Sequence, residues 1–251
     1  MQNTIVITDL TQMPIGNRVC VVGIDRQKQC IRLFEDDKGV LKEHLFIGGK
    51  LVIRPKAKIK CDFHTVSIRK PHIEDLGFDP NSTVYQGLCN DIEWETVLQD
   101  SSFSTVDDIF DGLLQQHRWV KPGANTRSIG TLSQAKILAV ELPLTSGKLK
   151  CRLLFQDKTG FKCNNPITDL AFWDLSYREV KKRSRDTTIV AQEIMSSIAT
   201  ADRVYLRLGL ARPYSPSNGS DEPRCWLQVT GIYTFPDYLK GKSFIDFQST
   251  Q

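Results

Sequence analysis

The sequence lacks the short motifs that most soluble enzymes use to hold phosphates, dinucleotides or catalytic metals. It contains no G-x-x-x-x-G-K-[ST], no G-x-G-x-x-G, no H-E-x-x-H and no G-x-S-x-G. A phosphate-binding loop, a dinucleotide site, a zinc protease and a hydrolase nucleophile elbow therefore have no support in the sequence. We expect a protein that is not an enzyme, with no catalytic residue and no cofactor.

Metal-binding residues are also scarce. The seven cysteines include no C-x-x-C pair, and Cys61-x-x-His64 has no matching second pair. With only four histidines in the chain, Asp62, His64 and His72 are the one alternative metal or nuclease site. The cysteines are scattered through apolar, strand-like segments, as is typical of reduced thiols. We expect no bound metal.

Long hydrophobic runs are absent. The most apolar candidate, residues 135–144, is interrupted by Lys136 and Glu141, and the N-terminus has neither the basic start nor the long apolar region of a secretory signal. We therefore expect a cytoplasmic protein that has no membrane partner.

Lys and Arg are missing from residues 74–117, which contain ten acidic residues. This acidic block reduces a net charge of +14 on the rest of the chain to +4 overall. Such a segregation of charge predicts a basic binding body with an acidic appendage. The block either serves only to solvate the protein or docks a protein partner through residues 74–117.

Period-two alternation of apolar and polar residues predicts strands at both ends of the chain. Residues 1–73 contain five predicted strands, near residues 4–8, 18–25, 30–34, 50–61 and 65–69. Residues 131–251 contain five more, near residues 135–142, 150–156, 170–177, 203–210 and 225–235. Between the third and fourth of these strands, the spacing of Val190, Ile194 and Ile198 predicts a helix over residues 187–200.

Five strands with a helix between the third and the fourth is the OB arrangement. The predicted fold is therefore mostly β with minor helices, in which two OB-like five-stranded barrels flank an acidic helical insert and linker at residues 74–130. A β-sandwich is the alternative, because strand counts do not establish how sheets close. Within the insert, a capping box at Ser104 and Asp107 predicts an amphipathic helix over residues 104–115, with Leu113 and Leu114 facing the body of the protein.

The strand-like segments also resemble a known family. The residues that carry the resemblance are Ile5–Ile7, residues 18–25, Cys30-Ile31-Arg32-Leu33, Leu51–Pro55, and the closing pair of residues 204–212 and 225–233. In these segments the chain resembles the dual OB-containing domain family of prokaryotes, which is associated with conflict and defence loci. The resemblance implies two OB folds and nucleic-acid recognition, with the protein acting as a subunit of an antiviral defence assembly. It assigns no site residue.

Basic residues alternate with apolar ones on several predicted strands, so that one face of each strand is cationic. Cations interleaved with aromatic rings suit single-stranded nucleic acid, because cations meet phosphates while rings stack on bases. A dense basic run that follows two aromatic residues adds a second candidate surface. The predicted nucleic-acid-binding residues are Arg32, Phe34, Arg54, Lys56, Lys58, Lys60, Trp173, Tyr177, Arg178, Lys181, Lys182, Arg183, Arg185, Arg203, Tyr205 and Arg207.

The sequence thus favours a non-catalytic module that recognises single-stranded or structured DNA or RNA. A barrel mouth that contains Arg and Tyr could equally hold a free nucleotide, so a nucleotide or small-ligand sensor is one alternative. A protein adaptor that docks through the acidic insert is the other.

Overall fold

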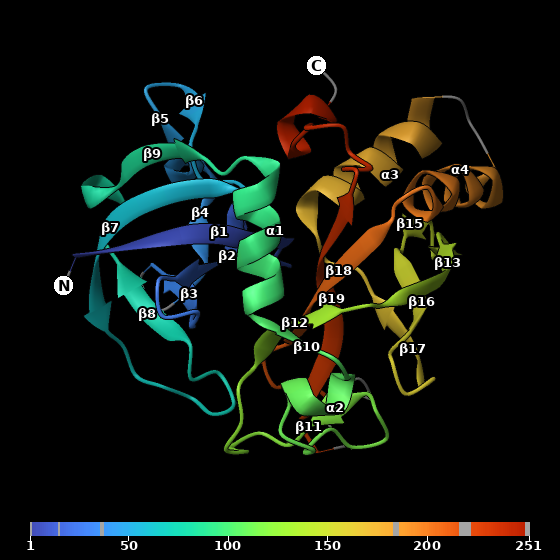
Figure 1. Ribbon diagram of the computed structural model, residues 1–251, viewed down its shortest axis with the longest axis horizontal. Coiled ribbons are helices and arrows are strands. Elements are labelled where there is room, and N and C mark those ends of the chain that lie inside the picture. The colour runs from blue at the N-terminus through green and yellow to red at the C-terminus, as the bar shows by residue number, and fades with distance from the viewer. Residues whose placement is uncertain (1, 15, 36–37, 183–185, 216–221, 249–251) are drawn as a thin grey trace.

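Two β-rich units lie side by side in the computed structural model, with helix α1 (Asp91–Asp100) packed between them (Figure 1). The structure describes residues 2–14, 16–35, 38–182, 186–215 and 222–248. Strands predominate and helices are few, as the alternation in the sequence predicts. The other helices are α2 (Val106–Ile109), α3 (Leu170–Lys182), α4 (Thr187–Ala199) and the 3-10 turns η1 (Lys42–Leu45), η2 (Pro80–Ser82) and η3 (Phe244–Asp246).

The first unit is a closed five-stranded barrel. Its strands follow the order β1-β2-β3-β8-β7, and β7 pairs back with β1 to complete the ring. All these pairs are antiparallel except β3 with β8, which is parallel. The strands of this sheet are β1 (Gln2–Gln12), β2 (Arg18–Asp25), β3 (Cys30–Phe34), β4 (Val40–Leu41), β7 (Ala57–Thr65), β8 (Asp75–Phe78) and β9 (Val84–Leu88).

Alternation along β7 explains how the barrel buries its core. Ala57, Ile59, Cys61 and Phe63 point inward and are buried, whereas the residues between them face outward. The predicted strand over residues 50–61 is in fact two strands, since a separate hairpin of β5 (Phe46–Ile47) and β6 (Lys50–Leu51) precedes β7. Because β8 and β9 belong to the first sheet, this unit extends beyond residue 73.

The second unit is a half-barrel made of two sheets. Strand β12 ends at Ser133, and after a bend at Gln134, where φ is 58°, the chain continues as β13 in the other sheet. On the other side of the unit, a parallel bridge from Ile167 to Val229 joins the two sheets. The first sheet contains β10 (Ser102–Phe103), β12 (Ile129–Ser133), β18 (Arg203–Leu210), β19 (Cys225–Phe235) and β11 (Trp119–Val120). The second contains β13 (Lys136–Glu141), β16 (Arg152–Gln156) and β17 (Lys162–Pro166), beside a hairpin of β14 (Leu144–Thr145) and β15 (Lys148–Leu149).

Helix α3 occupies the segment in which the sequence predicted a strand, so that prediction is wrong. Asp169 begins the helix, because its Oδ1 atom accepts a hydrogen bond from the backbone N–H of Phe172 at 2.7 Å. Leu170, Phe172 and Ser176 are buried, with Leu170 in the core of the first unit and Phe172 in that of the second. The predicted helix over residues 187–200 is confirmed as α4, which is capped by Asp186 and buries Val190, Ile194 and Ile198.

The predicted helix over residues 104–115 is reduced to the single turn of α2. The chain leaves helical geometry at Asp111 and Gly112, where φ is positive. Leu114 is buried as predicted, but Leu113 is 42% exposed, so the prediction that Leu113 faces the body is wrong. The acidic block instead contains α1, which the sequence analysis did not identify.

A buried ion pair joins the two units. Arg207 of β18 and Asp9 of β1 are both fully buried, and the Arg207 Nε atom lies 2.9 Å from Asp9 Oδ2. Thr131 accepts a second hydrogen bond from the guanidinium at 2.9 Å, and the Thr8 and Thr230 hydroxyls donate to the Asp9 carboxylate. Because both charges are buried, these added partners are needed to offset the loss of hydration.

A second polar network crosses the same interface. Asp75 of β8 accepts hydrogen bonds from Arg32 at 2.9 Å and from Arg212 at 2.8 Å, and Arg32 also donates to the Ser128 hydroxyl. His72 lies beside these cations and is almost fully buried. Burial and the two guanidinium groups lower the pKa of His72 to about 3, so this ring is neutral at physiological pH.

Asp169 lies where strand β1 meets the start of α3. Thr11 forms a bridge with Asp169, and the Gln12 backbone N–H donates to Thr168 O at 2.9 Å. Burial raises the pKa of Asp169 to about 7, and the nearby Asp9 carboxylate adds to this rise. The capping hydrogen bond to Phe172 opposes it.

We predict that Asp169→Asn flattens the dependence of stability on pH. A pKa that rises from 3.8 to about 7 on folding costs stability progressively as pH rises through this range, because the unfolded chain ionises freely in water whereas the folded state must hold the carboxylate in a buried site. Asn keeps the capping acceptor but carries no charge. At pH 8 the variant should be more stable than the native protein by about 1–4 kcal/mol in urea denaturation, with a smaller difference at pH 5. A loss of stability at both pH values would contradict this account.

Candidate nucleic-acid interface

The predicted cationic row on β7 does not form an open binding face, because α1 lies against it. Lys56 Nζ lies 3.0 Å from Asp91 Oδ1, and Lys58 Nζ lies 3.3 Å from Glu93 Oε2. The hydrogen bond from the Asn90 backbone and that from Lys58 lower the pKa of Glu93. The neighbouring predicted residues Arg54 and Lys60 are half-buried.

On β18, two of the three predicted binding residues instead hold parts of the protein together. Arg207 is buried and forms an ion pair with Asp9. Tyr205 is 4% exposed, and its hydroxyl donates to Gln99 Oε1 of α1 at 2.8 Å. Only Arg203 is exposed, and it is paired with Glu95 of α1. The prediction that this strand presents three side chains to a ligand is therefore wrong for Tyr205 and Arg207.

The remaining predicted residues are divided between the interface and α3. Arg32 is buried in the network with Asp75, and the Phe34 ring is covered by Arg212, whose guanidinium lies 4.8 Å from the ring centroid. The predicted residues on α3 differ in their exposure to solvent. Trp173 packs against the core, Arg178 is paired with Glu179, and Tyr177, Lys181 and Lys182 are exposed, whereas Arg183 and Arg185 lie outside the described residues.

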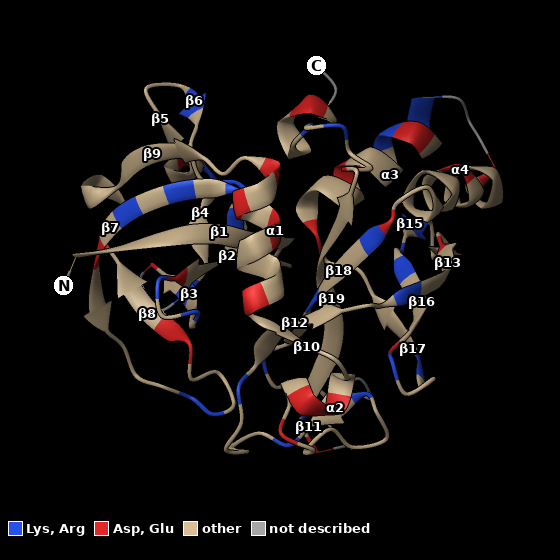
Figure 2. Ribbon diagram, in the orientation of Figure 1, with Lys and Arg blue, Asp and Glu red and all other residues tan. Residues whose placement is uncertain are grey.

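The structure thus brings together predicted residues from both units, but around an acidic helix. Lys56, Lys58, Arg203 and Tyr205 all contact α1. In Figure 2, acidic residues gather on α1 and α2, whereas Lys and Arg recur on the side formed by β13, β15, β16 and β17. The seam between the units is therefore neutralised by residues of the same chain.

A basic surface that sequence reasoning missed lies on the second unit. Residues 136–166 contain six cations and two acids. We call this surface the basic sheet; it comprises β13, β16, β17 and the β14–β15 hairpin, and its cations are Lys136, Lys148, Lys150, Arg152, Lys158 and Lys162. All except Arg152 are exposed, and none of the five exposed lysines forms an ion pair with an acid in the described part of the chain.

The two acids of the basic sheet do little to neutralise it. Asp157 is buried and accepts hydrogen bonds from the Thr159 and Val106 backbone N–H groups, at 2.9 and 3.1 Å. Glu141 accepts a hydrogen bond from Asn164, which in turn accepts from Arg152 Nε at 2.8 Å. The excess of lysine in this segment was the sequence signal that could have revealed the surface.

Beside the basic sheet lies an arginine–tryptophan cluster, made of Trp119, Tyr214, Arg224 and Trp226. Trp119 of β11 and Trp226 of β19 are paired across the two strands. The Arg224 guanidinium lies 4.6 Å from the Trp119 ring centroid and 5.5 Å from that of Trp226. Tyr214 is 59% exposed, and its carbonyl accepts a hydrogen bond from Trp226 Nε1.

Two contacts tie this cluster to the basic sheet. The ring of His117, two residues before Trp119, lies 3.7 Å from that of Phe161, which directly precedes Lys162. The Asn165 side chain of β17 donates to Leu227 O of β19 at 3.1 Å. The cluster therefore adjoins the β17 edge of the basic sheet.

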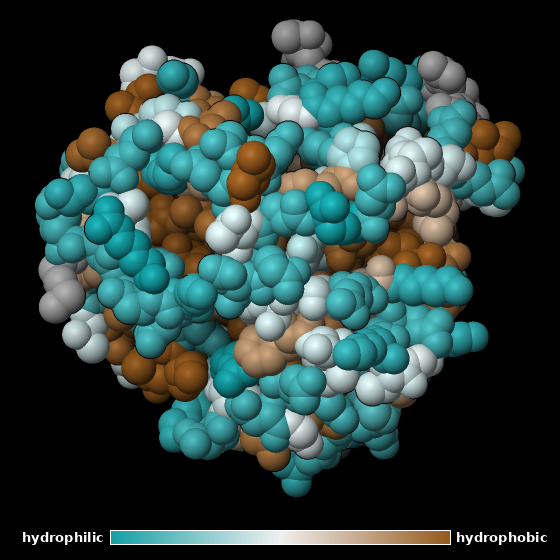
Figure 3. Space-filling model, viewed as in Figure 1, coloured by the Kyte–Doolittle hydropathy of each residue, from teal (hydrophilic) through white to brown (hydrophobic). Residues whose placement is uncertain are grey.

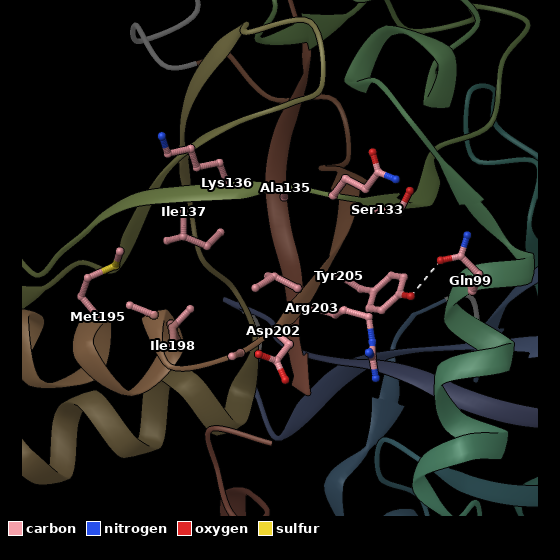
Figure 4. A pocket seen from close by; sticks show the side chains of 14 residues that line it. Gln99, Ser133, Ala135, Lys136, Ile137, Met195, Ile198, Asp202, Arg203 and Tyr205 are labelled. Atoms are coloured by element: carbon pink, nitrogen blue, oxygen red, sulfur yellow. Dashed lines mark hydrogen bonds between the residues drawn. The ribbon is translucent and has the colours of Figure 1, made fainter. Parts of the chain in front are cut away.

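A pocket of about 570 Å³ lies at the break between β12 and β13. Ile137 of β13 faces Met195 and Ile198 of α4 across it, and Tyr205 points from its floor toward Gln99 (Figure 4). Figure 3 shows a hollow on this face whose interior is hydrophobic and whose rim is hydrophilic. Lys136 extends away from the apolar walls in Figure 4 and contributes no charge to the centre.

No protein-family model and no curated protein matches the chain. Of the helices that the structure describes, none combines the length and apolar character needed to cross a membrane. Among the same described residues, no three His, Cys, Asp or Glu side chains gather where they could hold a metal ion, which excludes Asp62, His64 and His72 as such a group.

We predict that α1 is a structural brace rather than a loosely held appendage. Trp94 is 1% exposed and packs edge-to-face on Tyr233, with ring centroids 4.9 Å apart. Trp94→Ala should therefore destabilise the protein by about 3–5 kcal/mol in chemical denaturation. The matched control is Ile92→Ala on the same helix, since Ile92 is 80% exposed and its loss should change stability by less than about 0.5 kcal/mol. If the two substitutions changed the stability equally, α1 would not have this structural role.

Proposed function

We propose that this protein binds nucleic acid, either single-stranded or structured, on the basic sheet of its second unit. The observation that carries the proposal is the set of five exposed lysines on that sheet, which the described part of the chain leaves without acidic partners. Phosphate contacts by Lys and Arg supply most of the affinity of such complexes, through release of counterions.

The strand orders support an OB assignment for both units. In the first, the order β1-β2-β3-β8-β7 with one parallel pair corresponds to the strand order 1-2-3-5-4. In the second, β12 with β13, then β16, β17, β18 and β19 take the same five places, and the parallel bridge from Ile167 to Val229 links the third to the fifth. OB folds bind oligonucleotides on the face of strands 2 and 3 and on the loops that follow strands 1 and 4.

On this assignment, the basic sheet would form the binding face of the second unit. Strands 2 and 3 are β16 and β17, which carry Arg152 and Lys162, and the loop after strand 1 contains the β14–β15 hairpin with Lys148 and Lys150. The resemblance to the dual OB-containing domain family implies two OB folds and supports the fold assignment, but it assigns no binding residue. A role in antiviral defence, suggested by the same resemblance, stays a prediction, as does protein docking through residues 74–117.

The proposal predicts that Lys148→Glu, Lys150→Glu and Lys162→Glu together weaken binding of a fluorescent 20-nucleotide strand by at least about tenfold at low salt. The slope of log affinity against log salt should become shallower by about 2, since about three phosphate contacts are lost. Fluorescence anisotropy at several salt concentrations measures both quantities.

The matched control reverses three other exposed lysines, Lys181, Lys182 and Lys240, of which the first two belong to the basic run predicted from the sequence. This variant should keep its affinity within about threefold. If instead the control loses binding while the basic-sheet variant keeps it, the interface lies at the end of α3. If neither variant of the folded protein is weakened, nucleic-acid binding through either surface is refuted.

The pocket between β13 and α4 supports a second candidate function, the binding of a small ligand. Its size falls within the range of ligand sites, and its walls of Ile137, Met195 and Ile198 suit a flat apolar ring. At the rim, Arg203 is paired with Glu95, and Asp202 forms no ion pair with a cation in the described part of the chain. This balance favours an uncharged nucleoside, whose ribose hydroxyls could donate to Asp202, over a nucleoside triphosphate.

This second candidate predicts that one of the common nucleosides, at about ten times its Kd, raises the melting temperature by about 2–5 °C. Ala199→Trp should abolish the rise, because Ala199 lines the pocket from an exposed position on α4. Differential scanning fluorimetry measures both, with Ser196→Trp on the exposed side of α4 as the control. A rise that persists in the Ala199 variant would place the ligand elsewhere.

A further inference from the structure

The aromatic rings of the arginine–tryptophan cluster are not needed to fill the hydrophobic core beneath them. The core under β11 and β19 is filled by Val120, Cys225 and Leu227, which are all at most 1% exposed. Trp119 and Trp226 alternate with these residues and so lie on the outer side of the sheet. Two indoles on an outer face form a platform of aromatic surface that the packing of the core does not explain.

One of the two indole N–H groups in the cluster also has no acceptor among the described residues. Trp119 is 9% exposed, and its buried Nε1 atom has no partner among the described residues. A buried N–H without an acceptor costs free energy, and such a group calls for an explanation in a folded protein. Arg224 covers the ring but cannot serve as the acceptor, because a guanidinium only donates.

A structural explanation would have Arg224 simply shielding the two rings from water. That explanation accounts for the stacking distances of 4.6 and 5.5 Å. It does not account for the unpaired N–H of Trp119, nor for the exposure of Tyr214, whose backbone pairs with that of Arg224. A nucleobase suits this surface, because its flat face stacks on rings or on a guanidinium plane. Its carbonyl oxygens also accept hydrogen bonds, and one of them would reach the Trp119 N–H if Arg224 moved from the ring onto the base.

We propose that the arginine–tryptophan cluster stacks an unpaired base, and that the protein therefore selects single strands over duplexes. This inference rests on the proposed function, since the basic sheet would hold the phosphates of the same strand. In a duplex the faces of the bases are covered by their neighbours, so that only the phosphates would be engaged. A single strand offers both phosphates and free base faces.

The test compares Trp226→Ala with the native protein in fluorescence anisotropy. The probes are a 15-nucleotide DNA strand of mixed sequence, its RNA equivalent, the matching DNA duplex, and inorganic polyphosphate as a competitor that has charge but no bases. Loss of one stacked base should weaken binding of at least one single strand by about 5- to 150-fold. Duplex and polyphosphate binding should change by less than about twofold, and Trp226→Phe should retain most of the single-strand affinity.

Tyr177→Ala is the control, because Tyr177 is an exposed aromatic residue on α3, outside the cluster, and its loss should leave all four affinities unchanged. The inference is overturned if Trp226→Ala binds single strands normally, or if it weakens single strands, duplex and polyphosphate equally. If Trp226→Ala binds single strands normally but charge reversal of Lys148, Lys150 and Lys162 abolishes binding, the proposed function stands and only this inference fails. Normal binding by both of these variants would overturn the function as well.

Discussion

The buried pair of Arg207 and Asp9 sets the relation between the two halves of the molecule. These residues lie 198 positions apart in the chain, and neither side chain is exposed to water. Burying two charges is costly, and the cost is met only when each charge also has hydrogen-bond partners in a fixed geometry. Thr131, Thr230 and Thr8 provide these partners from three different strands, so the two units can pack productively in few other ways.

This fixed packing determines where positive charge is left exposed. It creates a seam into which α1 fits, and the helix places Asp91 and Glu93 against lysines of the first unit and Glu95 against Arg203 of the second. The cations nearest the seam are thereby neutralised. The basic sheet forms no ion pair with the acidic helix, and its five exposed lysines have no acidic partner among the described residues.

Alternation in the sequence correctly indicated β2, β3, β18 and β19, because each of these strands buries every second side chain or more. It could not reveal which outward side chains would stay exposed. The parity of Lys58 and Lys60 on β7 was read correctly, whereas Lys56 precedes the strand with a positive φ. The acidic partners of Lys56 and Lys58 come from a helix 35 residues away in the chain. Arg207 was assigned to an exposed face because a strand pattern contains no information about a second unit packing on it.

Other errors have local causes. The segment that forms α3 was predicted as a strand over residues 170–177, whereas the decisive signal is Asp169 as a helix cap. The basic sheet was overlooked because its lysines are spaced singly along a hairpin and two strands, and only the fold gathers them on one surface. Trp119 and Arg224 are 105 residues apart, so their stacking could not be read from spacing.

The most direct test of this account is to map the bound strand on the protein by two-dimensional amide NMR, with and without a single-stranded oligonucleotide. The account predicts shift changes concentrated in residues 148–166 and 224–228, with residues 56–60 and α1 unaffected. Shift changes confined to β7 and α1 would contradict it, because the seam would then open to admit the ligand and the acidic helix would be a competitor for it rather than a brace.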